Sequence, residues 1–199
     1  AHRSMTNAKA KVLTWPNALT ALRLLCVPIV GVLLWRDDPT SRDIAAVVFV
    51  LAAITDLVDG ALARRTGAET AFGAFADPVA DKALTGVALI GLSWLGDLPW
   101  WITVVIIVRE VVVTIVRLVV VRHGVIAASP GGKAKTVLQI IAIAMYLAVG
   151  PSWWVEIAQV IMLVAVVFTV VTGVDYLRRA WNLRQAAGTS KAPKSGGTS

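Results

Sequence analysis

Six long apolar stretches, separated by short polar or charged segments, set the pattern of the chain. Each is close to the length that a helix needs to cross a hydrocarbon core of about 30 Å. None shows the alternation of apolar and polar residues that marks a membrane-spanning strand. The pattern therefore predicts an all-α integral membrane protein, a bundle of six transmembrane helices at about residues 15–35, 44–64, 72–95, 100–121, 135–150 and 153–174.

Composition supports a membrane protein. With 57% hydrophobic residues and a mean hydropathy of +0.75, the chain is too apolar for a soluble domain of 199 residues. Cys26, alone in the first apolar stretch, is interpreted as a small hydrophobe. Tryptophans gather near the ends of the predicted helices, which favours an interfacial belt over a set of core aromatics. They are Trp15, Trp35, Trp94, Trp100, Trp101, Trp153 and Trp154, with Trp181 just past the last predicted helix.

The net charge of +7 is unevenly divided between the two sides of the predicted bundle. The connections opposite the termini contain only Arg36 and Arg42 among basic residues. The other side holds Arg3, Lys9, Lys11, Arg64, Arg65, Arg122, Lys133, Lys135, Arg178, Arg179, Arg184, Lys191 and Lys194. This positive-inside bias predicts a multi-pass protein of the inner (cytoplasmic) membrane with both termini in the cytoplasm. It also favours anionic lipid headgroups over nucleic acid as partners.

Four aspartates lie in or beside the second and third apolar stretches. Asp56 and Asp59 are three residues apart and Asp77 and Asp81 are four apart, so each pair lies on one face of its helix. An unpaired charge at the membrane centre costs roughly 2.5–3.5 kcal/mol, so ionisable residues at this depth indicate function. Those at apparent membrane depth are Arg23, Asp56, Asp59, Asp77, Asp81, Lys82, Arg109, Glu110 and Arg117.

If the two aspartate-bearing helices are antiparallel neighbours, the four carboxylates converge on one pocket. Crowded carboxylates repel one another unless protons or cations intervene, and an all-oxygen set suits hard divalent cations. Two such ions stabilise the attacking and leaving oxygens in phosphoryl chemistry. The sequence therefore indicates a site for two Mg²⁺ ions, with Mn²⁺ as an alternative, whose mouth faces the cytoplasm.

The segment between the aspartate pairs has features of a phosphate site. Gly60, Ala63 and Gly73 are small enough to let a ligand approach the helix backbones. Arg64 can bind a phosphate through two hydrogen bonds. Helix packing is the alternative explanation of the glycines, and anchoring at the membrane surface is that of the arginine.

Together these residues form the pattern Asp-x2-Asp-Gly-x2-Ala-Arg-x8-Gly-x3-Asp-x3-Asp, which runs without a mismatch from Asp56 to Asp81. The pattern resembles the signature of the CDP-alcohol phosphotransferase family. The resemblance, extended by softer similarities over roughly residues 13–180, implies a six-helix membrane enzyme, a homodimer with a polar cavity facing the cytoplasm. It also implies a reaction in which an alcohol displaces CMP from a CDP-linked lipid.

Carried over position by position, the resemblance assigns roles to the motif. The four aspartates hold the divalent metals, and Asp81 is also the general base that takes the proton from the acceptor hydroxyl. A polar stripe on the first helix is expected to face the same pocket, with a helix cap and a snorkelling arginine as the alternative reading. The CDP-lipid site then comprises Asn17, Thr20, Arg23, Gly60, Ala63, Arg64 and Gly73.

The fourth and fifth apolar stretches are expected to select the acceptor. Their Arg-Glu pair and Gly-Lys-x-Lys-Thr segment resemble the branch of the family that transfers to glycerol 3-phosphate. A phosphorylated acceptor needs a cationic pocket, and helix-start amides near a threonine can assist it. The candidates are Arg109, Arg117, Lys133, Lys135 and Thr136. Glu110 is interpreted as a residue that orients an arginine.

The expected reaction joins CDP-diacylglycerol to sn-glycerol 3-phosphate and gives phosphatidylglycerophosphate and CMP. Inositol phosphate and phosphatidylglycerol, the acceptor in cardiolipin synthesis, are the alternatives within the family. A membrane prenyltransferase, a divalent-cation transporter and a non-catalytic scaffold are alternatives from other classes. The spacing of the aspartates and their restriction to two helices favour the transferase. Asp175, near the end of the last helix, has no predicted role.

We expect one six-helix catalytic membrane domain over residues 13–180. Residues 1–12 are expected to form a cytoplasmic segment, in which the four residues before Met5 are interpreted as a cloning remnant. Residues 181–199 are expected to form a disordered cytoplasmic tail, because the chain from about Gly188 is rich in Gly, Ser, Thr, Lys and Pro. The first helix is long and contains Arg23, which argues against a cleavable signal peptide.

Overall fold

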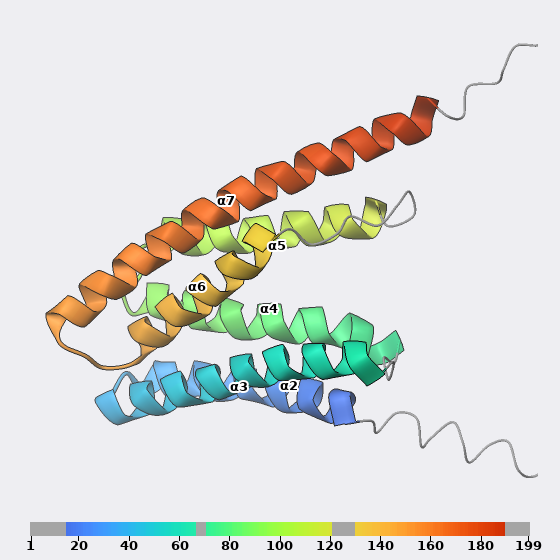
Figure 1. Cartoon of the computed structure of the whole chain (residues 1–199). Helices are drawn as coiled ribbons and strands as arrows, with labels where there is room; N and C mark the ends of the chain where they lie inside the picture. Colours follow the sequence, from blue (N-terminus) through green and yellow to red (C-terminus); the bar gives the residue numbers. More distant parts are fainter. Residues whose placement is uncertain (1–14, 67–70, 121–129, 190–199) are drawn as a thin grey trace, which may run out of the picture.

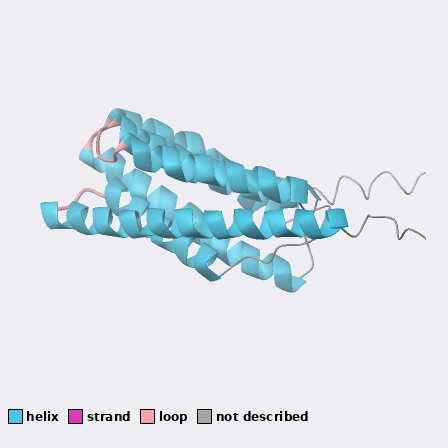
Figure 2. Ribbon diagram, turned by 90° about the horizontal axis from the view of Figure 1, so that it is seen from above, coloured by secondary structure: helices cyan, strands magenta, loops and turns pink. Residues whose placement is uncertain are grey.

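The computed structural model describes residues 15–66, 71–120 and 130–189. Within these ranges the secondary structure elements are helices (Figure 2), and consecutive helices run in opposite directions (Figure 1). They are α2 Trp15–Arg36, α3 Pro39–Thr66, α4 Ala71–Trp94, α5 Trp100–Val120, α6 Pro130–Leu147 and α7 Ser152–Thr189. The predicted all-helical fold with six helices is thus confirmed for the described part of the chain.

Two helices differ from their predicted limits because local chemistry, and not hydropathy, sets helix ends. α6 starts at Pro130 instead of near residue 135, since proline is favoured at the first position of a helix. α7 continues to Thr189, because residues 175–187 contain good helix formers and neither glycine nor proline. Arg179 also pairs with Asp175 one turn earlier, at 3.0 Å. The helix therefore includes residues 181–189, which corrects our expectation of a tail from residue 181.

The outside of the bundle is apolar. Two of the described helices are long and apolar enough to span a membrane, over Leu19–Arg36 and Ser152–Gln185, whereas ionisable residues interrupt α5 in its second half. Exposed aliphatic side chains include Leu22, Leu25, Val32, Ile44, Val47, Leu51, Val104, Val108, Ile115, Val160, Val167 and Val171. An exterior of this kind indicates contact with lipid. The protein is therefore membrane-associated, and six complete spans stay a prediction.

Exposed tryptophans mark one end of the bundle, on the left in Figure 1, where α2 and α4 end and α5 and α7 begin. We call it the tryptophan end. The amphipathic indole ring is favoured at a membrane–water interface, and Trp35 is 80% exposed. The alternative of core aromatics is wrong for the exposed residues at this end, which are Trp35, Trp94, Trp100, Trp101 and Trp153.

Arg42 connects the chain segments at the tryptophan end. Its Nη2 donates to Asp97 Oδ2 at 2.5 Å and to the Tyr146 carbonyl oxygen at 2.9 Å. Nearby, Asp38 caps α3 by accepting a hydrogen bond from the Ser41 backbone N–H at 2.9 Å. Hydrogen bonds from Ser41 lower the pKa of the Asp38 carboxyl. The ion pair with Asp97 accounts for Arg42, one of the two basic residues in the connections at this end.

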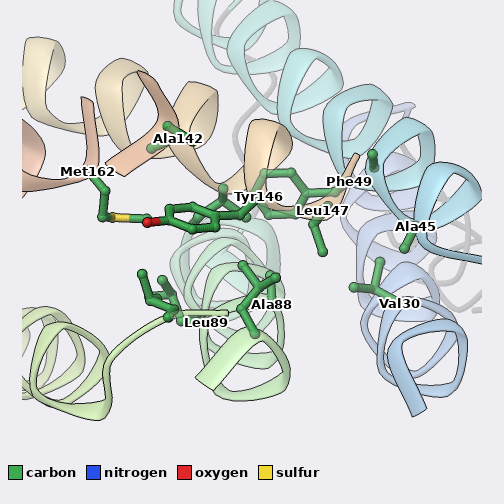
Figure 3. Packing of buried hydrophobic residues seen from close by; sticks show 14 of the residues in the cluster. Val30, Ala45, Phe49, Ala88, Leu89, Ala142, Tyr146, Leu147 and Met162 are labelled. Atoms are coloured by element: carbon green, nitrogen blue, oxygen red, sulfur yellow. The ribbon is translucent and has the colours of Figure 1, made fainter. Parts of the chain in front are cut away.

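The apolar core lies in the half of the bundle next to the tryptophan end, and Figure 3 shows part of its packing. Helices α2, α3, α4, α6 and α7 contribute, respectively, Val30, Phe49, Leu89, Leu147 and Met162. Further from that end the helices change from apolar to polar at a common level. The last core residue and the next polar residue beyond it are Leu84 and Lys82 in α4, Ile106 and Arg109 in α5, and Val166 and Thr169 in α7. A polar layer of side chains therefore lies directly beyond the apolar core, on the side away from the tryptophan end.

Candidate active site

The motif aspartates lie on two antiparallel helices that contact each other. Asp56 and Asp59 are in the second half of α3, and Asp77 and Asp81 are in the first half of α4, on the side away from the tryptophan end (Figure 1). Asp81 is partly buried, whereas the side chains of the other three lie outside the described residues. The helix arrangement supports the predicted convergence, which stays a prediction for the side chains.

The donor chemistry of the four aspartates fits a divalent metal. Mg²⁺ prefers carboxylate and other oxygen ligands, and two pairs at helical spacing on contacting helices supply them. Among the side chains that the structure describes, no three His, Cys, Asp or Glu residues gather into a metal site. That search reaches only Asp81 of the four predicted ligands. The metal site is therefore a prediction from the donor set.

The polar stripe of α2 faces the inside of the bundle. Thr20 and Arg23 are 2% and 3% exposed, while Leu22 and Leu25 between and beyond them are exposed on the outside. A buried arginine in an apolar helix needs polar surroundings, so this face of α2 belongs to the polar layer. The remaining candidates have helical backbones but side-chain positions outside the described residues, namely Asn17, Gly60, Ala63, Arg64, Gly73 and Lys133.

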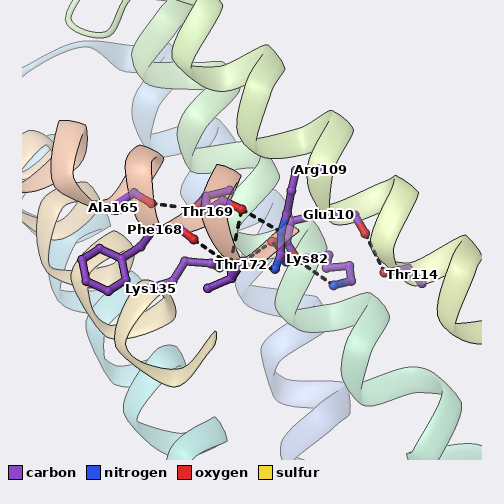
Figure 4. A network of polar contacts seen from close by, with 9 residues as sticks. All are labelled: Lys82, Arg109, Glu110, Thr114, Lys135, Ala165, Phe168, Thr169 and Thr172. Carbon is purple, nitrogen blue, oxygen red and sulfur yellow. Dashed lines mark hydrogen bonds and ion pairs between the residues drawn. The ribbon is translucent and has the colours of Figure 1, made fainter. Parts of the chain in front are cut away.

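Three cations from three helices converge on the carboxylate of Glu110 in α5 (Figure 4). Lys82 of α4 donates to Oε2 at 2.9 Å, and Arg109 donates from Nη1 to Oε1, also at 2.9 Å. Lys135 of α6 donates to the same Oε1 and is 5% exposed. We call these four residues the Glu110 cluster. Its three positive charges exceed its negative charge by two, which favours a dianionic ligand such as a phosphate monoester.

Arg109 also ties α5 to α7. Its Nε donates to the Thr169 carbonyl oxygen at 3.3 Å, and its Nη2 donates to Thr172 Oγ1 at 3.1 Å (Figure 4). Gly173 leaves room for the arginine, because a Cβ there would lie 3.1 Å from Arg109 Cγ and 3.3 Å from Nε. All three guanidinium nitrogens thus have a protein partner, and Arg109 is held by both helices.

A Gly173→Ala variant is expected to lower the free energy of unfolding by about 1–2 kcal/mol, because the added methyl group meets an arginine that three hydrogen bonds hold in place. Gly86→Ala is the matched control, since no heavy atom lies within 4 Å of its Cβ position. Alanine is also the better helix former, so its thermal midpoint should stay equal or rise. Thermal unfolding in detergent measures both, and equal midpoints for the two variants would contradict the packing argument.

Comparison with known proteins identifies the family. Residues 13–171 match the family described as CDP-alcohol phosphatidyltransferase. The chain belongs to this family. A Mycobacterium tuberculosis protein named "Probable phosphatidylglycerophosphate synthase" is 49% identical over 175 residues, which cover 86% of this chain and 84% of that protein.

Two further relatives carry the name CDP-diacylglycerol–glycerol-3-phosphate 3-phosphatidyltransferase. The Bacillus subtilis protein is 39% identical over 182 residues, which cover 83% of this chain and 94% of the relative. The Pseudomonas fluorescens protein is 40% identical over 178 residues, with 83% and 89% covered. The resemblance to a CDP-alcohol family is confirmed, and the protein is a phosphatidyltransferase. The prenyltransferase, transporter and scaffold alternatives are set aside.

The structure gives the positions of two further candidates for the acceptor site of this phosphatidyltransferase, Arg117 and Thr136, whose roles stay predictions. Arg117 is exposed, and its guanidinium carbon lies 5.9 Å from the centre of the Tyr176 ring. It follows Glu110 by seven residues, so it lies on nearly the same face of α5, about 10 Å further along the helix. Thr136 lies six residues inside α6, because that helix starts at Pro130. Its amide is therefore in the helix interior, and the idea of helix-start amides at Thr136 is wrong.

The sequence interpretation missed the contact between Lys82 and Glu110. It counted Lys82 among the ionisable groups at membrane depth but gave it no partner. Its position directly after Asp81, the last residue of the motif, was the available signal. Glu110 is interpreted as a residue that orients an arginine, and it accepts a hydrogen bond from Arg109; the same carboxylate also accepts hydrogen bonds from two lysines.

Proposed function

We propose that this phosphatidyltransferase transfers the phosphatidyl group of CDP-diacylglycerol to sn-glycerol 3-phosphate and releases CMP. The observation that carries the proposal is the Glu110 cluster, whose excess of two positive charges suits the phosphate of a small acceptor. The acceptor named in the Bacillus and Pseudomonas relatives, glycerol 3-phosphate, has such a group. Phosphatidylglycerol offers only a phosphodiester with a single charge and suits the cluster less well.

The reaction requires one proton transfer and one displacement at phosphorus. Asp81 accepts the proton from the 1-hydroxyl of glycerol 3-phosphate. The oxygen then attacks the phosphorus that bears diacylglycerol, and the bond from that phosphorus to the oxygen bridging to CMP breaks. The electron pair leaves with CMP, whose charge needs neutralisation. No covalent enzyme intermediate is needed, because the attack is direct and in line.

Metal and nucleotide sites follow from the motif in the same proposal. Asp56, Asp59, Asp77 and Asp81 would hold two Mg²⁺ ions, or Mn²⁺, which supply the positive charge that favours departure of CMP. The CDP-lipid is bound by the small and basic residues of the motif and by the buried stripe of α2. These residues are Gly60, Ala63, Arg64, Gly73, Asn17, Thr20 and Arg23.

In the same proposal, the chain crosses the membrane six times and the protein forms a homodimer. Both termini and the mouth of the site lie in the cytoplasm. Support comes from the ends of the bundle. Five of the six tryptophans in the described residues that are exposed lie at the tryptophan end, and the sixth, Trp181, is on the last turns of α7. Arg178, Arg179 and Arg184 of the positive-inside count also lie toward the last turns of α7. The start of α2 and the end of α7 both lie away from the tryptophan end (Figure 1).

An acceptor competition tests the proposed function. Purified protein in lipid vesicles with Mg²⁺ and CDP-diacylglycerol receives labelled glycerol 3-phosphate, inositol phosphate or phosphatidylglycerol. We expect CMP release and labelled phosphatidylglycerophosphate with the first acceptor alone. Turnover with inositol phosphate alone would show that inositol phosphate is the acceptor and would leave the proposed mechanism unchanged. Absence of CMP release with all three acceptors would overturn the proposal.

A further inference from the structure

Glu110 lies where four helices meet in the polar layer. It is at the middle of α5, as Lys82 is at the middle of α4, and Lys135 reaches it from α6. Through Arg109 the same point is joined to α7 (Figure 4). One carboxylate thus fixes two lysines that come from positions 28 residues before it and 25 residues after it in the chain.

We propose that Glu110 is a positioning residue for the acceptor, which holds the ammonium groups of Lys82 and Lys135 where both also bind the phosphate of glycerol 3-phosphate. This inference rests on the proposed function. It adds Lys82 to the acceptor site, and it gives Glu110 a role in the placement of two lysines as well as of an arginine.

The chemistry of the side chains supports this division of roles. A lysine has a flexible four-carbon stem and three N–H donors, so one bond to Glu110 leaves donors for a ligand while it removes most of the freedom of the stem. Fixing the two stems in advance lowers the entropy lost when the phosphate binds. Arg109 differs, because each of its three nitrogens already donates to Glu110, Thr169 or Thr172. It anchors the cluster to α7.

The position of Lys82 links the acceptor phosphate to the reacting end of the site. Lys82 directly follows Asp81 on α4, so the two side chains leave the helix about 100° apart at the same level. A phosphate held by Lys82 therefore brings the acceptor close to the predicted base. Glu110 acts on this arrangement only through the lysines. Its removal should therefore weaken binding of the acceptor more than binding of the donor lipid.

The test compares the effect of a variant on the KM for glycerol 3-phosphate with its effect on the KM for CDP-diacylglycerol. In a Glu110→Gln variant, we expect the KM for glycerol 3-phosphate to rise about tenfold, in line with the loss of bonds to a charged group. The KM for CDP-diacylglycerol is expected to change less than twofold. Glu110→Asp keeps the charge with a shorter stem and should lie between the variant and the wild type.

Lys82→Gln tests the same contact from the other side and should also raise the KM for glycerol 3-phosphate about tenfold. The double variant of Lys82 and Glu110 should resemble the single variants, because the two changes remove one shared arrangement and their effects do not multiply. A hundredfold rise in the double variant would mean that the residues act independently, which contradicts positioning.

The matched control breaks a different polar contact between the same two helices. Ser93 of α4 and Thr103 of α5 form a buried hydrogen bond at 2.7 Å near the tryptophan end. Thr103→Val should lower the thermal midpoint and leave both KM values within twofold. If Glu110→Gln and Lys82→Gln also left both values unchanged, or raised them equally, the positioning role would be overturned. Failure of the wild type to use glycerol 3-phosphate would instead overturn the proposed function and this inference with it.

Discussion

Replacement of Asp81 by asparagine is expected to lower kcat by roughly 10²- to 10⁴-fold, the range that removal of a general base produces. Asparagine has nearly the same shape, so the helix and its packing should be kept. It cannot accept a proton from the acceptor hydroxyl, and it is a poorer ligand for a hard cation than a carboxylate. Asp81 is on α4 directly before Lys82 of the Glu110 cluster, which places both parts of the proposed chemistry together.

Release of CMP at saturating substrates measures this effect, and circular dichroism with thermal unfolding in detergent reports whether the variant folds. Asp175→Asn is the matched control, because Asp175 is an aspartate of α7 that pairs with Arg179 at 3.0 Å on an exposed surface. We expect its kcat to stay within about twofold of wild type, as surface ion pairs contribute little. Full activity in the Asp81 variant would show that the base is a different residue.

Replacement of Lys135 by methionine is expected to raise the KM for glycerol 3-phosphate by roughly 10- to 100-fold, the range that a lost bond to a charged group gives. Lys135 is buried in the polar layer and donates to Glu110. Its loss removes one positive charge from the cluster at a place where water cannot easily compensate for it. Lys135→Arg keeps the positive charge but not the compact ammonium group, so we expect a smaller rise in the KM for glycerol 3-phosphate. The affinity for CDP-diacylglycerol should change little.

Initial rates over a range of each substrate separate the two affinities. Arg184→Gln provides the control for a general loss of positive charge, since Arg184 is exposed on the last turns of α7. Its KM values are expected to stay within about twofold. If the Lys135 variant lost affinity for both substrates equally, the residue would support the fold of the site and not the acceptor.

The sequence alone determined the helices and the chemistry that lies along one helix. An apolar stretch of membrane length forms a helix for reasons that its own residues supply. Likewise the i, i+3 and i, i+4 spacing of Asp56 with Asp59 and of Asp77 with Asp81 defines a face without reference to any other helix. The family motif is of this local kind and was readable before any fold was known.

Tertiary structure decided which residues from different helices share a site. Lys82, Glu110 and Lys135 meet because three helices have a particular depth and rotation, and these follow from packing over the whole core. Hydropathy reports that a residue is in a helix, but rotation about the helix axis decides whether it faces lipid, core or ligand.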